Sequence, residues 1–203
     1  PHSVPEVIPA RQLSPQSVAE VFVSSTPFPP DDRSIGWVRG ISVSQAWDEA
    51  TTRAAVETAG YLAEHLDELA GTRSGDKDRS EKLRAFCRTL ARRAFRRPLT
   101  DAETNQFVNR QFTAASDEAT AVKRVTLLVL LSPRFLFREV HDQPDAFDVA
   151  ARLSFGLWDS IPDETLLQAA EAGQLATPEQ VTGQAERMLA DVRAKTKLRE
   201  FLL

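Results

Sequence analysis

The sequence predicts an all-α protein, an irregular bundle of about eight or nine helices with a proline-rich N-terminal arm and loop. Apolar residues recur at three- and four-residue spacing almost everywhere after residue 42, which is typical of helices with one buried face. Several of the predicted helices begin at a capping residue that is followed three positions later by an acidic or amide residue. No stretch alternates with period two for long enough to predict a strand.

Composition narrows the class of protein. The 203 residues, 42% hydrophobic and 27% charged, can build a substantial core. The net charge of −4 argues against a chain that binds polyanions as a whole. No apolar run reaches the roughly 18 residues of a membrane-spanning helix. The single cysteine, Cys87, lies on the apolar face of a predicted helix, so we expect a buried thiol.

Residues 1–75 form the first of three predicted units. It comprises an extended arm, a short helix from Ser14, a proline-rich loop and a long helix. The long helix is capped by Ser42 or Ser44 and runs to about Leu69. The polar stretch GTRSGDKD then predicts a connector.

The second unit, residues 76–140, holds the most strongly patterned segment, LRAFCRTLARRAFRRP. Its apolar residues share one helix face, and we expect the helix to run to Arg97, where Pro98 disfavours further helix. Thr100 and Glu103 predict a capping box for the next helix. Along the opposite side runs a basic stripe, here called the arginine stripe: Arg84, Arg88, Arg92, Arg93, Arg96 and Arg97.

The arginine stripe is the candidate interaction surface. It could hold nucleic acid, an anionic polysaccharide or a phosphate. We favour a structural role, in which the arginine stems cover apolar surface and their heads pair with carboxylates such as Asp101, Glu103 or Glu139. Nucleic acid is the weakest candidate, because the chain is acidic and the stripe lacks interleaved exposed aromatic residues.

The third unit, residues 141–203, is expected to be the start of a second helical domain of a longer protein. Asp145 caps its first helix, and the second is predicted to begin at Ser160 or Ile161, with Pro162 in its first turn. A helix opened by the capping sequence TPEQ follows. One more helix covers the last residues.

Five acidic residues flank one predicted helix of this unit. Two carboxylates could perform acid–base chemistry or hold a divalent cation. Each of the five lies near a helix end, where capping and the helix dipole explain acidic residues, so we favour a structural role. Arg134 and Arg138 are candidates to pair with them. The structural carboxylates are Asp145, Asp148, Asp159, Asp163 and Glu164.

Four segments resemble those of large exported proteins best known from planctomycetes. They are ARRAFRRPLTDAE, LLVLLSPRFLFRE, AARLSFGLWDSIPDETLL and ERMLADVRAKTKLREFLL, in this order and at similar spacing. Such proteins consist of a series of domains of unknown function and often carry a cytochrome c module. The match covers mainly residues 80–203 and is weaker over 14–70. The resemblance implies a location in the periplasm or cell envelope and a c-type haem on a partner or a further domain.

No cofactor or metal is expected in this chain itself. It has no Cys-x-x-Cys-His motif, and its three histidines, His2, His65 and His141, are not at ligand spacing. The leading hypothesis is a non-catalytic helical module that packs against further domains of the same protein or a partner subunit and supports a haem electron-transfer assembly.

The alternative is part of a redox or hydrolytic envelope enzyme acting on polysaccharide. That enzyme would need a pocket that holds several of the named carboxylates and arginines without mutual pairing. The sequence leaves open whether the chain catalyses a reaction.

Overall fold

The computed structural model describes residues 22–29, 44–137 and 144–202, and all regular elements within these ranges are helices. With α4, η2 and α5 counted as one continuous helix there are ten, eight of them seven residues or longer, which confirms the predicted all-α class. The arm, the helix start at Ser14 and most of the proline-rich loop lie outside the described residues. The elements are α1 (Gln45–Glu64), α2 (Leu66–Leu69), α3 (Arg79–Phe95), α4 (Asp101–Glu103), the π-helical η2 (Thr104–Asn109), α5 (Arg110–Ala114), α6 (Glu118–Leu130), α7 (Pro133–Leu136), α8 (Ala146–Trp158), α9 (Glu164–Glu171), α10 (Pro178–Leu189) and α11 (Val192–Leu202).

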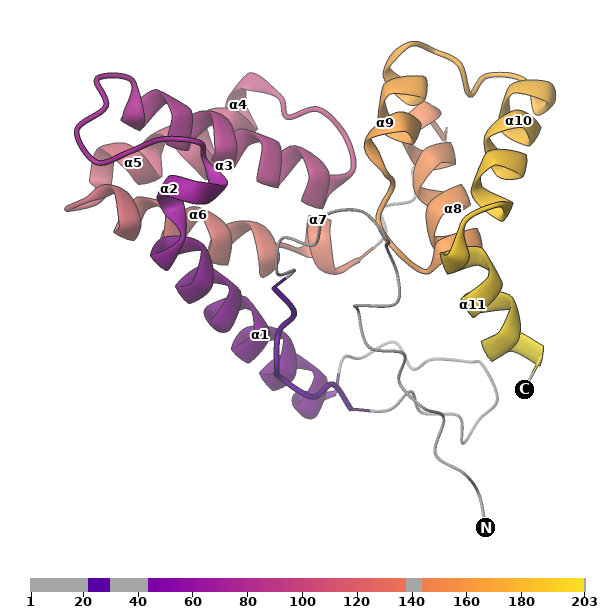
Figure 1. Ribbon diagram of the computed structural model, residues 1–203, viewed down its shortest axis with the longest axis horizontal. Coiled ribbons are helices and arrows are strands. Elements are labelled where there is room, and N and C mark those ends of the chain that lie inside the picture. Colours follow the sequence, from indigo (N-terminus) through magenta and orange to yellow (C-terminus); the bar gives the residue numbers. More distant parts are fainter. Residues whose placement is uncertain (1–21, 30–43, 138–143, 203) are drawn as a thin grey trace.

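The first hydrophobic cluster lies between α1, α3, η2 and α6. Helix α1 packs along α6, and α3 packs against α6 from the other side (Figure 1). The three- and four-residue spacing of apolar side chains on α3 and α6 puts one face of each helix into this core. Its fully buried members include Leu83, Cys87, Val108, Val122, Val125 and Val129.

Helix α1 is shorter than predicted. Ser44 is its N-cap, with a side-chain oxygen that accepts a hydrogen bond from Trp47 N at 3.2 Å. The helix ends at Glu64, because His65 leaves the helical conformation, and the short α2 continues to Leu69.

Helix α3 also ends earlier than predicted, and this corrects the arginine stripe. Arg96 adopts a left-handed conformation, φ 61°, directly after Phe95. The chain therefore turns before it reaches Pro98, and the last two arginines leave the helix. Thr100 does open the next helix with the predicted capping box.

The second hydrophobic cluster lies within α8 to α11. Helix α8 packs against α9, α10 and α11, and the four helices form a lobe beside the α1–α6 lobe (Figure 1). Trp158 is at its centre and donates a hydrogen bond from Nε1 to Met188 O at 2.9 Å. The buried members are Ala150, Trp158, Leu166, Ala169, Ala170, Leu175, Met188 and Ala194.

The predicted start of the helix after α8 is wrong. Neither Ser160 nor Ile161 begins it, because Asp163 is the N-cap and its side chain accepts from Leu166 N at 2.9 Å. Pro162 consequently lies in the connector, buried, and not in the first turn. Within the described ranges, no helix combines the length and the apolar character that a membrane crossing requires.

Candidate functional site

The arginine stripe does not form one continuous basic surface. Arg84 lies over the ring of Phe112, with 4.6 Å from Cζ to the ring centroid. Arg88 donates to Glu81 at 2.6 Å. Arg93 is exposed. Arg84 and Arg88 therefore contact residues of their own helical lobe.

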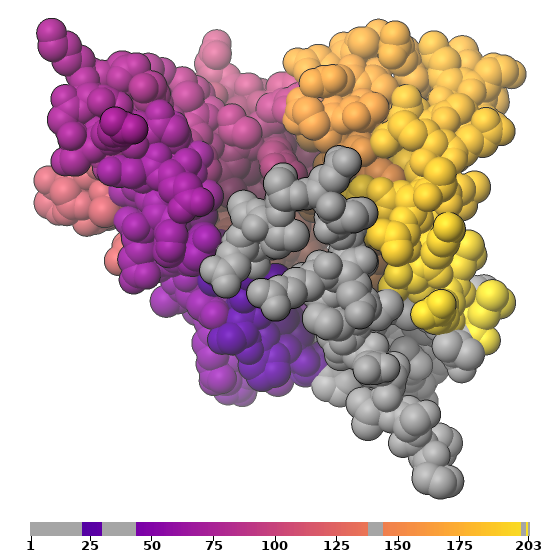
Figure 2. Space-filling model, viewed as in Figure 1, coloured from indigo at the N-terminus to yellow at the C-terminus, as the bar shows by residue number. Residues whose placement is uncertain are grey.

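Arg92 joins the two lobes. Its Nη1 donates to both carboxylate oxygens of Glu164, at 3.0 and 2.9 Å, and its Nη2 donates to Glu171 at 3.3 Å. The bond from Arg92 lowers the pKa of Glu164. Glu164 and Glu171 both lie on α9, so this arginine bridges α3 to α9. In Figure 2 the magenta surface of the first lobe meets the orange surface of the second.

Arg97 forms a partly buried ion pair with Glu103, one of the carboxylates that the sequence suggested as a partner for the stripe. Nη2 and Nη1 donate to the two carboxylate oxygens at 2.8 and 3.0 Å. Arg134 lies 3.3 Å from the same carboxylate. The hydrogen bond from Arg97, followed by that from Thr100 N, holds the pKa of Glu103 at about 2. Glu139 and Arg138, the other pairing candidates, lie outside the described residues.

Arg96 has a role that the stripe pattern did not predict. It is buried, at 4% exposure. Its guanidinium donates to the carbonyl oxygens of Arg134, Phe135 and Phe137 at 2.6, 3.3 and 3.0 Å, and it lies 5.7 Å from the ring centroid of Phe155. Arg96 therefore fixes the end of α7 and lies at the face of α8.

Asp145 and Asp148 cap α8. The Asp145 Oδ1 accepts from Phe147 N at 2.8 Å and from Asp148 N at 2.9 Å. The Asp148 carboxylate accepts from Asp145 N at 3.0 Å, which completes the capping box. Both carboxylates thus satisfy helix N–H groups that would otherwise lack a partner.

Asp163 and Asp159 each have a cationic partner, as Glu164 has in Arg92. Asp163 accepts two hydrogen bonds from Arg187, at 2.8 and 3.1 Å. Burial, the largest single cause, raises the pKa of Asp163, but the hydrogen bonds from Arg187 and Leu166 N and the nearby arginine charges together lower it below its ordinary value. Asp159, in the left-handed region at φ 53°, accepts from Lys197 at 3.2 Å. The five carboxylates are therefore spread over separate structural contacts.

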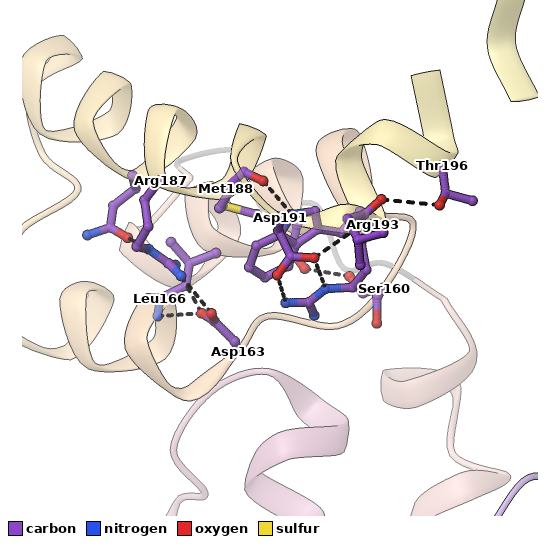
Figure 3. A network of polar contacts seen from close by, with 12 residues as sticks. Ser160, Asp163, Leu166, Arg187, Met188, Asp191, Arg193 and Thr196 are labelled. Carbon is purple, nitrogen blue, oxygen red and sulfur yellow. Dashed lines mark hydrogen bonds and ion pairs between the residues drawn. The ribbon is translucent and has the colours of Figure 1, made fainter. Parts of the chain in front are cut away.

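Two arginines of this lobe lie over the Trp158 ring. The Arg193 Cζ lies 3.5 Å from the Trp158 ring centroid, and the Arg187 Cζ lies 5.6 Å from it. Asp191 holds Arg193 with contacts of 3.0 and 2.9 Å. Figure 3 shows Asp163 facing Arg187 and Asp191 facing Arg193. These charges position α10 and α11 on α8.

A groove of about 700 Å³ lies between the two lobes. Helix α1, the end of α7 and the end of α8 form its walls, and the segment 22–29 lines one side. Of the candidate residues, Arg96 and Asp159 reach it, and both hold the contacts given above. Sequence periodicity could not have located this groove, because its walls are separated by about a hundred positions. We call it the junction groove; its aromatic lining residues are Phe22, Phe28, Trp47, Phe135 and Phe155.

Cys87 and His65 both have ordinary structural surroundings. Cys87 is fully buried, and burial raises the pKa of its thiol to about 12. His65 contacts Tyr61 O at 2.8 Å and stacks on the Tyr61 ring. Among the described residues, no three His, Cys, Asp or Glu side chains are grouped as a metal ion would require. His2 and His141 lie outside these residues.

Two family models match consecutive parts of the chain. Residues 82–139 match PSD5, described as a protein of unknown function (DUF1595). Residues 145–203 match PSD4, described as a protein of unknown function (DUF1592). No curated protein and no solved structure matches the chain. The second match coincides with the α8–α11 lobe and the first with α3 to α7, so the chain is a helical module that carries matches to two successive domains of unknown function.

Proposed function

We propose that the chain is a non-catalytic structural and interaction module of a multidomain exported protein, and that it positions a c-type haem carried by a further domain or a partner subunit. One observation carries this proposal. The five candidate carboxylates and five of the six stripe arginines each hold a cap, an ion pair, a carbonyl contact or a ring contact inside the module. Groups committed to such contacts stabilise an arrangement of helices instead of a reacting molecule.

The internal joint of the module supports the same function. Arg92 connects α3 to α9, and Arg96 holds the end of α7 beside α8. Both arginines thereby contribute to a defined placement of one lobe against the other. A defined placement is what a module needs when it orients other domains.

Helices α10 and α11 offer the surface on which we place the partner. Leu198 and Leu202 lie one turn apart on α11 and are 53% and 77% exposed. Leu189 and Val192 are also exposed, at the α10–α11 corner. Large apolar side chains exposed along α11 and at its corner with α10 favour a contact with another protein surface.

The enzyme alternative has weaker support. It required a pocket with several carboxylates and arginines that do not pair with one another or with neighbours. The junction groove contains Arg96 and Asp159, whose polar atoms are held by carbonyl oxygens and by Lys197. This arrangement favours the module over a catalytic site.

The experiment is isolation of the full-length protein from its native host, with mass spectrometry of the copurifying proteins and an absorption spectrum for haem. The variant Leu198→Gln removes one exposed apolar side chain, and Lys195→Gln, also exposed on α11, is its control. We expect a haem-containing protein or domain with the wild type and Lys195→Gln, and a reduced yield of it with Leu198→Gln. A colourless protein that copurifies with no partner would overturn the proposal.

A further inference from the structure

The junction groove has the size and lining of a ligand site. We propose that it binds a small, uncharged, apolar molecule. Its volume of about 700 Å³ lies within the range of small-molecule sites, which are mostly apolar and often lie where two domains meet. This function is independent of the proposed haem partner, because none of the exposed apolar side chains of α10 and α11 lines the groove.

Three apolar walls define the groove. Trp47 and Ala54 come from α1, Phe135 from α7 and Phe155 from α8. Aromatic rings on facing walls provide large, flat contact areas for an apolar ligand. The small side chain of Ala54 leaves room between them.

Three of the hydroxyl groups that line the groove donate elsewhere. Thr51 Oγ1 donates to Trp47 O at 2.9 Å, and Thr58 Oγ1 donates to Ala54 O at 2.7 Å. Ser24 Oγ donates to Glu57 at 2.6 Å. With their protons so used, these hydroxyls offer no donor to an anionic ligand, and the two threonines of α1 add methyl groups to the wall.

The charged groups of the groove likewise favour an uncharged ligand. Arg96 donates to carbonyl oxygens at the end of α7, and Asp159 accepts from Lys197. A charged ligand that paired with Arg96 or Asp159 would compete with these contacts, and burial of an unpaired charge is costly. An uncharged molecule leaves both contacts intact.

The segment 22–29 forms one side of the groove. It has no helix or strand and is anchored on α1, where Glu57 accepts from Ser24 Oγ, from Ser25 N at 2.9 Å and from Thr26 Oγ1 at 3.2 Å. The bond from Ser24 and its neighbours holds the pKa of Glu57 at about 2. Phe28, half exposed, lines the groove from this segment.

The test is a fluorescence titration of the full chain with N-phenyl-1-naphthylamine, a neutral apolar probe. We expect saturable binding at one site per chain. Ala54→Trp should weaken it about tenfold or more by filling the groove, whereas Val56→Trp, on the exposed side of α1, should leave it unchanged. Glu57→Gln, which loosens the anchor of the 22–29 segment, should change the affinity without unfolding the helices.

Two further measurements test whether the variants are folded and whether the groove prefers an uncharged ligand. Circular dichroism confirms that each variant is folded, and Thr58→Met, a smaller change in the same wall, replaces Ala54→Trp if that variant does not fold. The anionic probe 1-anilinonaphthalene-8-sulfonate should bind more weakly than the neutral one. Absence of saturable binding, equal loss in Ala54→Trp and Val56→Trp, or tighter binding of the anion would each overturn the proposal.

Discussion

The Arg97 guanidinium donates two parallel hydrogen bonds to the Glu103 carboxylate, at 2.8 and 3.0 Å. The same carboxylate accepts from Thr100 N at 2.9 Å and lies 3.3 Å from Arg134. Glu103 is 8% exposed. One carboxylate therefore connects the turn after α3, the start of α4 and the α7 segment.

Glu103→Gln should lower the free energy of unfolding by about 2 to 3 kcal/mol, because it removes a charged acceptor from buried contacts. Urea unfolding of both proteins measures the change. The control is Glu186→Gln on the exposed side of α10, which should change stability by less than about 0.5 kcal/mol. Equal effects of the two substitutions would contradict the assigned role of Glu103.

Glu103 should also make stability depend on pH. Its pKa is about 2 in the folded protein, against 4.5 for an ordinary glutamate, with the Arg97 hydrogen bond as the largest cause. Between these values the unfolded chain binds more protons, so the free energy of unfolding falls as the pH falls. The stabilisation that the ionised Glu103 provides is complete above pH 4.5 and is lost near pH 2.

Unfolding curves between pH 2 and 7 measure this dependence. The stability difference between the wild type and Glu103→Gln should be constant near neutral pH and shrink as the pH falls through that window. A difference that stays constant down to pH 2 would show that the carboxylate charge does not carry the contact.

The capping predictions were possible because a capping box is local. Thr100 with Glu103 and Thr177 with Gln180 lie three positions apart, so their side chains reach each other's backbone N–H in any helix start. The same reasoning failed at Ser160, where a serine with Pro162 two positions later resembled a helix start. The capping side chain there is Asp163, which accepts from Leu166 N.

Arg96 and the junction groove could not be predicted from periodicity. The stripe pattern assumes helix through Arg97, but the left-handed conformation of Arg96 turns its side chain inward. Its partners are carbonyl oxygens about forty residues later in the chain. Spacing within one helix contains no information about such distant backbone atoms.

Arg92→Gln should lower the free energy of unfolding by about 1 kcal/mol at low salt, because it removes contacts with both Glu164 and Glu171. The carboxylates are about half exposed, so salt should screen the interaction. The difference from the wild type should therefore shrink in 1 M salt, at a Debye length of about 3 Å. Arg93→Gln, the exposed neighbour on α3, is the control.

Urea unfolding at both salt concentrations measures the Arg92 effect. A loss that is independent of salt would indicate that packing of the arginine stem, and not its charge, joins the lobes. An equally large loss of stability in Arg93→Gln would show that the change in net charge, and not the contacts of Arg92, causes the loss.

Arg96 and Asp159 are the two non-glycine residues with positive φ in the described ranges, at 61° and 53°, and glycine should affect them in opposite ways. Glycine adopts this conformation without strain. At Asp159 it removes only an exposed contact with Lys197, so stability should stay the same or rise by up to about 1 kcal/mol.

Arg96→Gly should instead lower the free energy of unfolding by about 3 kcal/mol, because it removes a buried guanidinium and leaves partly buried carbonyl oxygens at the end of α7 without their donor. Urea unfolding compares the two glycine variants directly. Arg96→Lys keeps the charge but lacks the planar fork that reaches several carbonyl oxygens, so it should also be destabilised. If Arg96→Gly were as stable as Asp159→Gly, the backbone strain of Arg96 would outweigh its hydrogen bonds, and Arg96 would not be what holds α7 beside α8.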